Sequence, residues 1–116
     1  MAAPESMPFG LPDHAVRQLG ELFGGDPRIQ AVWLYGSRAL GRERPGSDID
    51  LCIEGPVLGL DDLYALENRI DDLLLPWKVD LSLMHKIDNP ALLDHIRRVG
   101  LDLLKLRNGP AIQHGS

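Results

Sequence analysis

The sequence has little cysteine and few aromatic residues. Cys52 is its only cysteine, and Phe, Trp and Tyr together make up 5% of the 116 residues. A single cysteine cannot form an internal disulfide bond, which agrees with a reducing compartment. The uncharged apolar runs, such as residues 73–77, fall far short of the roughly 20 residues of a membrane-spanning helix. Because residues 1–10 also lack a basic start followed by an apolar stretch, we expect a cytoplasmic protein.

Positive charge is in deficit along the chain. Lys and Arg number 12 against 17 Asp and Glu, which gives a formal net charge of −5. General binding of nucleic acid depends on Lys and Arg neutralising phosphates, so we predict that the chain binds nucleic acid poorly. Three arginines nevertheless fall within seven residues of a glycine-containing segment: Arg38, Arg42 and Arg44. This cluster indicates a small anionic ligand such as a nucleotide phosphate.

Hydrophobic periodicity and turn residues predict a single domain in which helices and strands alternate. The length allows one core and no second domain. The expected order is helix, strand, loop, strand, helix, strand, helix, strand, over residues 13–23, 29–35, 36–47, 47–53, 60–75, 78–84, 90–99 and 101–106. We predict an α/β (α+β) fold, a small mixed β-sheet with helices packed on one face. The domain spans residues 13–106, between a flexible arm over 1–12 and a flexible tail over 107–116.

Two aspartates stand two positions apart in the strand predicted over 47–53. Successive residues of a strand alternate between its faces, so Asp48 and Asp50 are expected side by side, opposite the apolar row of that strand. Two neighbouring carboxylates repel each other, and a shared divalent cation relieves the repulsion. The pair therefore predicts a magnesium site. The alternative interpretation is a solvent-exposed strand edge.

A third carboxylate and a glycine–serine pair extend this hypothesis. If the strands over 47–53 and 78–84 are neighbours, Asp80 converges with Asp48 and Asp50 into a site for two metals, as in enzymes of phosphoryl and nucleotidyl transfer. Gly36 lets the backbone approach a phosphate closely, while the following amides and the Ser37 hydroxyl donate hydrogen bonds to phosphate oxygens. Taken alone, Asp80 is more typical of a surface carboxylate.

These residues together resemble a known family. The run Leu-Tyr-Gly-Ser-Arg-Ala-Leu-Gly at 34–41, followed by Gly-Ser-Asp-Ile-Asp-Leu at 46–51, is similar to the signature of minimal nucleotidyltransferases in the DNA polymerase β-like superfamily. The segment Val-Asp-Leu at 79–81 is similar to the segment that carries this superfamily's third aspartate. The resemblance covers roughly residues 13–106 and implies a nucleotidyltransferase fold like the palm of polymerase β.

The resemblance also implies roles for single residues. In the family, the residues that match Asp48 and Asp50 bind the metals, which are two Mg²⁺ ions. The residues that match Gly36 and Ser37 hold the triphosphate of ATP. The residue that matches Asp80 completes the metal site and helps activate the acceptor hydroxyl. Arg38 matches a position that is often basic, so it either contacts phosphate or lies on the surface.

Small members of this family usually occur with a helical HEPN-domain protein as toxin–antitoxin pairs. The resemblance implies that this chain is the antitoxin, which transfers AMP from ATP to a tyrosine of the HEPN toxin. Two alternatives stay open. One is an inactive antitoxin that neutralises the toxin by binding alone. The other is a nucleotidyltransferase that acts on a small molecule or an RNA 3′ end. A homo-oligomer and a hetero-oligomer with the toxin are both compatible with the sequence.

Other reactive or aromatic side chains receive structural interpretations. The histidines are too scattered along the chain for a metal site, so we interpret them as surface or capping residues. We interpret Cys52 as a small buried filler beside the site, because no nearby histidine would activate it as a nucleophile. Trp33 and Trp77 are interpreted as core or interface aromatics. The histidines in question are His14, His85, His95 and His114.

Overall fold

The computed structural model describes residues 10–44 and 46–106. The parts of the predicted arm and tail at 1–9 and 107–116 lie outside the described residues. The elements are α1 (Asp13–Gly24), β1 (Ala31–Tyr35), β2 (Ile49–Glu54), α2 (Leu60–Asp71), β3 (Val79–Leu83), the 3-10 helix η2 (Met84–Lys86), α3 (Pro90–Val99), β4 (Leu101–Asp102) and α4 (Leu103–Leu106). The predicted alternation of helices and strands is therefore confirmed. Throughout the described ranges, every helix is too short or too polar to cross a membrane.

The four strands form one mixed sheet in the order β3-β2-β1-β4. β1 pairs antiparallel with both β2 and β4, whereas β2 and β3 run parallel. A parallel pair needs a crossover connection, and α2 supplies it between β2 and β3. The prediction of a small mixed sheet is confirmed, and the strands predicted over 47–53 and 78–84 are neighbours.

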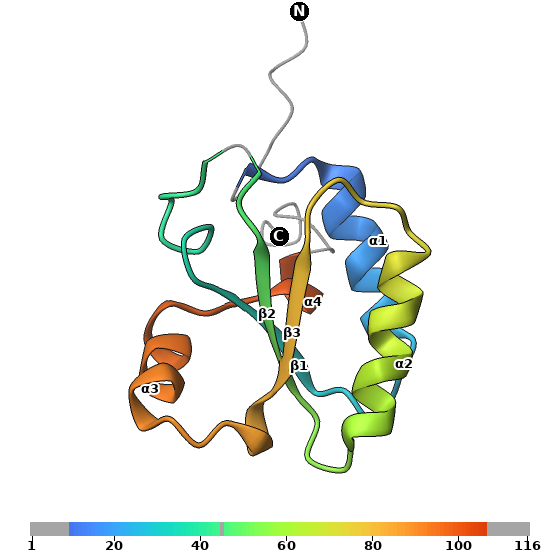
Figure 1. Cartoon of the computed structure of the whole chain (residues 1–116), viewed down its shortest axis with the longest axis vertical. Coiled ribbons are helices and arrows are strands. Elements are labelled where there is room, and N and C mark those ends of the chain that lie inside the picture. The colour runs from blue at the N-terminus through green and yellow to red at the C-terminus, as the bar shows by residue number, and fades with distance from the viewer. Residues whose placement is uncertain (1–9, 45, 107–116) are drawn as a thin grey trace, which may run out of the picture.

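One face of the sheet carries the hydrophobic core. Val32, Leu34, Leu51 and Ile53 alternate along β1 and β2 with residues of the other face, and all four are completely buried. The helical side chains of this core come from α1, α2 and α4: Val16, Leu19, Leu22, Phe23, Leu63, Leu66, Ile70 and Leu103. Figure 1 shows α1 and α2 together on this side of the strands. Burial of these apolar side chains is the main force that closes the fold.

Helix α3 is the exception to the predicted packing on one face. It lies across the sheet from α1 and α2, on the left of Figure 1. Asn89 begins it as predicted, because its side chain accepts hydrogen bonds from the backbone amides of Ala91 and Leu92. Ile96 is its one buried residue and lies outside the main core cluster, beside Trp33. The helix therefore covers part of the face that carries the polar strand residues.

The sequence predicted helix α2 four residues too long. Helix α2 ends at Asp71, whereas the leucine pattern and Pro76 predict an end at Leu75. The amides of Leu73 and Leu74 bond to carbonyls three residues back, which tightens the chain, and Leu74 then adopts a positive φ of 56°. A proline disfavours the helical conformation of the residue before it. Leu75 precedes Pro76, so the helix could not continue to residue 75.

The ends of the domain also differ from expectation. The strand predicted over 101–106 is a two-residue strand followed by helix α4. Asp102 causes the change, because its carboxylate accepts a hydrogen bond from the amide of Leu104 and so caps the short helix. At the other end, Leu11 is completely buried in the core. Ordered packing thus begins before residue 13, where the sequence had placed the domain boundary.

Candidate active site

The turn after β1 brings glycine next to a carboxylate. Gly36 follows the last strand residue and has a φ of +80°, in the region that favours glycine. The amide of Leu40 donates to the Gly36 carbonyl, as in the single helical turn predicted after Ser37. A Cβ atom at Gly36 would collide with Oδ2 of Asp50. A glycine is therefore needed here for two reasons, the backbone conformation and the close approach of β2.

The register of the sheet brings two of the three predicted carboxylates together. Asp50 lies directly opposite Asp80 in the parallel pair, and opposite Tyr35 in the antiparallel pair. Neighbouring strands are about 4.8 Å apart, so the two aspartates share one face at adjacent positions. Asp50 is half-buried and Asp80 is exposed. Asp48 is also exposed and precedes β2, because the strand begins at Ile49 and not at 47 as predicted.

The charges at this end of the sheet repel one another. Burial raises the pKa of Asp50, and the negative charges of Asp80 and Asp48 raise it further. The positive charge of Arg38 opposes these effects without cancelling them. No three acidic, histidine or cysteine side chains of residues 10–44 and 46–106 are placed closely enough to hold a metal ion in this conformation. The unneutralised carboxylate oxygens are nevertheless the hard ligands that Mg²⁺ prefers, so the donor set fits a divalent cation.

Arg38 links the two ends of the loop that carries the site. Its side chain is only 2% exposed and donates hydrogen bonds to the carbonyls of Ser47, at 2.7 Å, and Asp48, at 3.3 Å. Its guanidinium also lies over the ring of Trp77, 5.7 Å from the centroid. These contacts hold Asp48 close to the glycine turn. The phosphate contact predicted for Arg38 stays a prediction, and Arg42 and Arg44 are exposed.

His95 reaches the same turn from α3, which the sequence analysis missed. The amide of Gly36 donates to Nε2 of His95 at 3.3 Å, so we assign the ring proton to Nδ1. The imidazole also contacts the ring of Tyr35 edge-on, with centroids 6.1 Å apart. The amide of Gly36 is therefore already bonded in this conformation, and the phosphate contacts predicted for Gly36 and Ser37 stay predictions. No sequence pattern pointed to His95, because its role depends on α3 crossing the polar face.

Two further side chains on the polar face have raised pKa values. Burial raises the pKa of the Tyr35 hydroxyl, and the nearby charges of Asp50 and Asp80 raise it too, although a hydrogen bond with Ser82 acts in the opposite direction. Cys52 is completely buried, and burial raises the pKa of its thiol to about 11. A thiol with that pKa is not a nucleophile at neutral pH, which agrees with the interpretation of Cys52 as a filler.

The family model for "Polymerase beta, Nucleotidyltransferase" matches residues 17–107. The chain belongs to this family. The match includes the glycine turn, β2 and β3, and it confirms the resemblance drawn from the sequence. A comparison with curated proteins finds no match for this nucleotidyltransferase chain.

Solved structures of toxin–antitoxin systems share the fold. One, described as a toxin–antitoxin with AMP-PNP, has a TM-score of 0.62 and 23% identity, and the match covers 80% of this chain and 73% of that one. A mutant of the toxin–antitoxin pair MntA-HpeT has a TM-score of 0.60 and 20% identity, and the match covers 80% of this chain and 72% of that one. A tri-AMPylated Shewanella oneidensis HEPN toxin in complex with MNT antitoxin has a TM-score of 0.59 and 19% identity, and the match covers 78% of this chain and 71% of that one. At these identities the likeness shows the fold.

Proposed function

We propose that the protein is a magnesium-dependent nucleotidyltransferase that transfers AMP from ATP to a tyrosine hydroxyl of a HEPN toxin and so acts as the antitoxin. One observation carries the proposal. Asp50 faces Asp80 across parallel strands, beside a left-handed glycine turn, in a chain of the polymerase beta nucleotidyltransferase family. Adjacent carboxylates next to a phosphate-binding turn are the arrangement that nucleotidyl transfer requires.

The carboxylates would hold the metal. Asp48, Asp50 and Asp80 are the oxygen donors of the site, and the raised pKa of Asp50 supports a bound cation as the natural partner of its negative charge. When bound, Mg²⁺ neutralises charge on the phosphate oxygens and orients them for in-line displacement. Arg38 contributes indirectly, because it holds the backbone of Asp48 in place.

The residues of the chain then have distinct tasks in the transfer. A bond forms between the acceptor oxygen and the α-phosphorus of ATP, and the bond from that phosphorus to pyrophosphate breaks. Ser37 donates hydrogen bonds to the departing phosphates. The acceptor hydroxyl, with an ordinary pKa near 10 for tyrosine, must lose its proton, and Asp80, an exposed carboxylate on the edge strand, can take it.

The position of Asp80 supports a macromolecular acceptor. β3 is an edge strand, so the side of the site that Asp80 occupies is open to a large molecule. The fold neighbours supply the class of partner, since one of them is an AMPylated HEPN toxin in complex with an MNT antitoxin. We therefore place a HEPN-domain toxin as the partner and ATP as the nucleotide donor.

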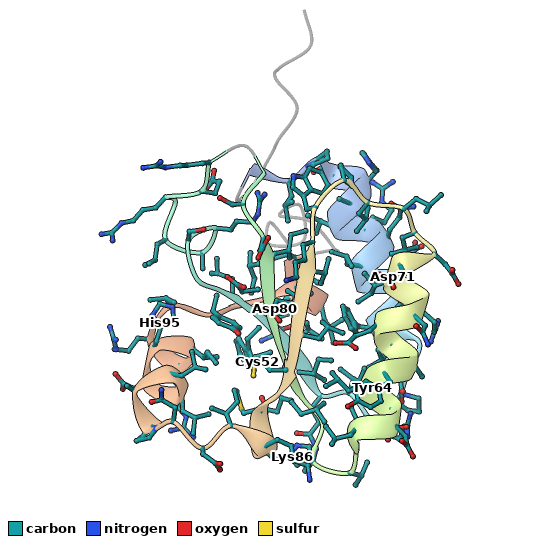
Figure 2. All side chains as sticks on the ribbon, viewed as in Figure 1. Cys52, Tyr64, Asp71, Asp80, Lys86 and His95 are labelled. Atoms are coloured by element: carbon teal, nitrogen blue, oxygen red, sulfur yellow. The ribbon has the colours of Figure 1, made fainter. Side chains whose placement is uncertain are left out.

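The test takes as acceptor a HEPN-domain protein, sought in the gene next to that of this chain. The purified pair is incubated with Mg²⁺ and ATP labelled at the α-phosphate, and the label on each protein is measured. We expect label on the HEPN protein with the unchanged chain, and none with the double variant Asp48→Asn plus Asp50→Asn. The control Asp71→Asn changes an exposed aspartate on α2, across the sheet from the site (Figure 2), and should transfer at the normal rate.

Three outcomes would overturn the proposal or part of it. If the double variant labels the partner as well as the unchanged chain does, the carboxylates are not the site of transfer. If no label appears and the double variant still neutralises the toxin in cells, the chain acts by binding alone. Transfer of label to a small molecule or an RNA 3′ end, with the HEPN protein unlabelled, would replace the acceptor.

A further inference from the structure

A cavity of about 260 Å³ lies on the same face of the sheet as the carboxylates. It is lined by Trp33 of β1, Glu54 of β2, Met84 of η2, and Ile96 and Arg97 of α3. Figure 2 shows Cys52, the residue paired with Trp33, on the side of the sheet that faces α3. The function proposed above does not use this cavity.

The pairing of β1 with β2 shows where the cavity lies relative to the carboxylates. Trp33 and Cys52 form a pair two positions along the strands from Tyr35 and Asp50. At about 3.4 Å per residue, Glu54 lies roughly 14 Å from Asp50 along β2, whereas Trp33 lies roughly 7 Å from the level of Asp50. That separation lets one bound nucleotide reach both places, with its α-phosphate at Asp50 and its base over Trp33.

The polar groups around the cavity are arranged to receive a ligand between them. Oε1 of Glu54 accepts a hydrogen bond from the indole Nε1 of Trp33 at 3.1 Å, which fixes the ring and the carboxylate together. Oε2 of Glu54 has no hydrogen-bond partner in the part of the chain that the structure describes. Arg97 is exposed and forms no ion pair with any described residue. Opposite charges thus line one small cavity without pairing with each other.

This combination has the chemistry of a base-binding site. Indole and guanidinium planes stack on nucleobases. A carboxylate oxygen accepts from an exocyclic amino group, and an arginine donates to purine N7 or O6. The volume is below the 300–1,000 Å³ of pockets that enclose whole drug-sized ligands, so it suits one planar ring system with the sugar and phosphates outside.

We propose that the cavity between Trp33, Glu54 and Arg97 binds the purine base of the nucleotide donor. The inference rests on the proposed nucleotidyl transfer and assigns its base specificity to this chain. Purines stack over a larger area of the indole than pyrimidines do, and both adenine and guanine carry an amino group for Glu54. The two purines share this chemistry, and the binding experiment distinguishes them.

The experiment measures binding by calorimetry in the presence of Mg²⁺. The probes are AMP-PNP, the corresponding GTP and UTP analogues, and inorganic tripolyphosphate, which has no base. The variants are Arg97→Ala and Glu54→Gln, and Arg98→Ala serves as the matched control because it removes the neighbouring exposed arginine of α3. Each variant is first checked for an unchanged melting temperature, and neither cavity variant removes a buried apolar side chain.

We expect the unchanged chain to bind AMP-PNP or the GTP analogue at least about tenfold more tightly than the UTP analogue and tripolyphosphate. Arg97→Ala and Glu54→Gln should weaken purine binding about fivefold and leave tripolyphosphate binding unchanged. The control Arg98→Ala should leave the binding of every probe unchanged. Equal binding of all four probes, or equal effects of Arg97→Ala and Arg98→Ala, would overturn the inference while the phosphate site stands. If even tripolyphosphate and the purine analogues fail to bind, both the inference and the proposed function are wrong.

Discussion

The two faces of the sheet are made by alternate residues of the same strands, yet they follow opposite physical rules. On β2, Leu51 is completely buried among the side chains of three helices, whereas its neighbour Asp50 is half-buried beside Asp80. On the apolar face, burial of nonpolar side chains stabilises the fold. On the polar face burial and like charges raise the pKa of a carboxylate, which indicates a position that costs stability.

The difference shows how a short chain can hold a reactive site. The apolar face is covered by α1, α2 and α4, and its core is continuous from Leu11 to Leu103. Among the described helices, α3 is the one that lies over the polar face, and it has one buried residue. The first face therefore supplies the free energy that keeps two repelling carboxylates at adjacent positions on the second. Such trade-offs between stability and function are common at active sites.

Asp50→Asn should have the largest effect on activity and an opposite effect on stability. Under the proposed function Asp50 holds the metal, and its loss removes several kcal/mol of transition-state stabilisation, so we expect transfer of AMP to fall at least about a hundredfold. The amide also removes the repulsion with Asp80, so the melting temperature without metal should rise by a few degrees. Transfer of label and thermal unfolding measure the two effects.

Magnesium provides the control for this prediction. Added Mg²⁺ should raise the melting temperature of the unchanged chain, because a ligand that binds only the folded state stabilises it. It should raise that of Asp50→Asn much less. A variant that retains activity within threefold, or that melts at a lower temperature than the unchanged chain without metal, would contradict the contrast between the two faces.

Leu51→Ala tests the apolar face at the adjacent residue. Truncation of a completely buried leucine leaves a cavity, and we expect the free energy of unfolding to fall by about 2–5 kcal/mol. Leu60→Ala is the control, because Leu60 is 53% exposed at the start of α2 and should cost less than about 0.5 kcal/mol. Denaturant titration measures both. Equal losses for the two variants would show that the core does not depend on this face.

Gly36→Ala isolates the contact between the turn and β2. Gly36 and Gly41 have similar positive φ values, 80° and 73°, so alanine carries a similar backbone cost of about 1–2 kcal/mol at either position. A Cβ atom meets nothing within 4 Å at Gly41 but collides with Asp50 at Gly36. We expect Gly36→Ala to lose about 1 kcal/mol more stability, and only this variant should lose most of its transferase activity. The same effect at both positions would rule out the role of close approach.

Much of this fold was predictable because its signals are local. Asn89 and Pro90 mark the start of α3 through bonds to their own neighbours, and the alternation in 78–84 predicted β3. The errors arose where a single residue overrides a pattern. The leucines after Asp71 continue a helical stripe, but the chain turns away before Pro76. Asp102 stands in an apolar run and still ends the strand, because its side chain caps α4.

The candidate site divides in the same way. The prediction that strands 47–53 and 78–84 are neighbours is confirmed, and this brings Asp50 and Asp80 together. The roles of these carboxylates and of Gly36 and Ser37 stay predictions. The burial of Arg38 and the approach of His95 were out of reach, because each depends on distant segments folding over the turn. No spacing in the sequence relates residue 36 to residue 95.

His95 therefore gives the finest test of how α3 serves the polar face. His95→Ala removes the acceptor for the Gly36 amide, which costs about 1 kcal/mol where the amide is partly shielded from water. We expect KM for ATP to rise about fivefold with little change in kcat, since the turn loses its support while Asp50 and Asp80 stay in place. His95→Gln offers an amide oxygen as a replacement acceptor and should recover part of the loss. If His95→Ala instead lowers KM, the imidazole competes with phosphate for the Gly36 amide and α3 restrains the site rather than supporting it.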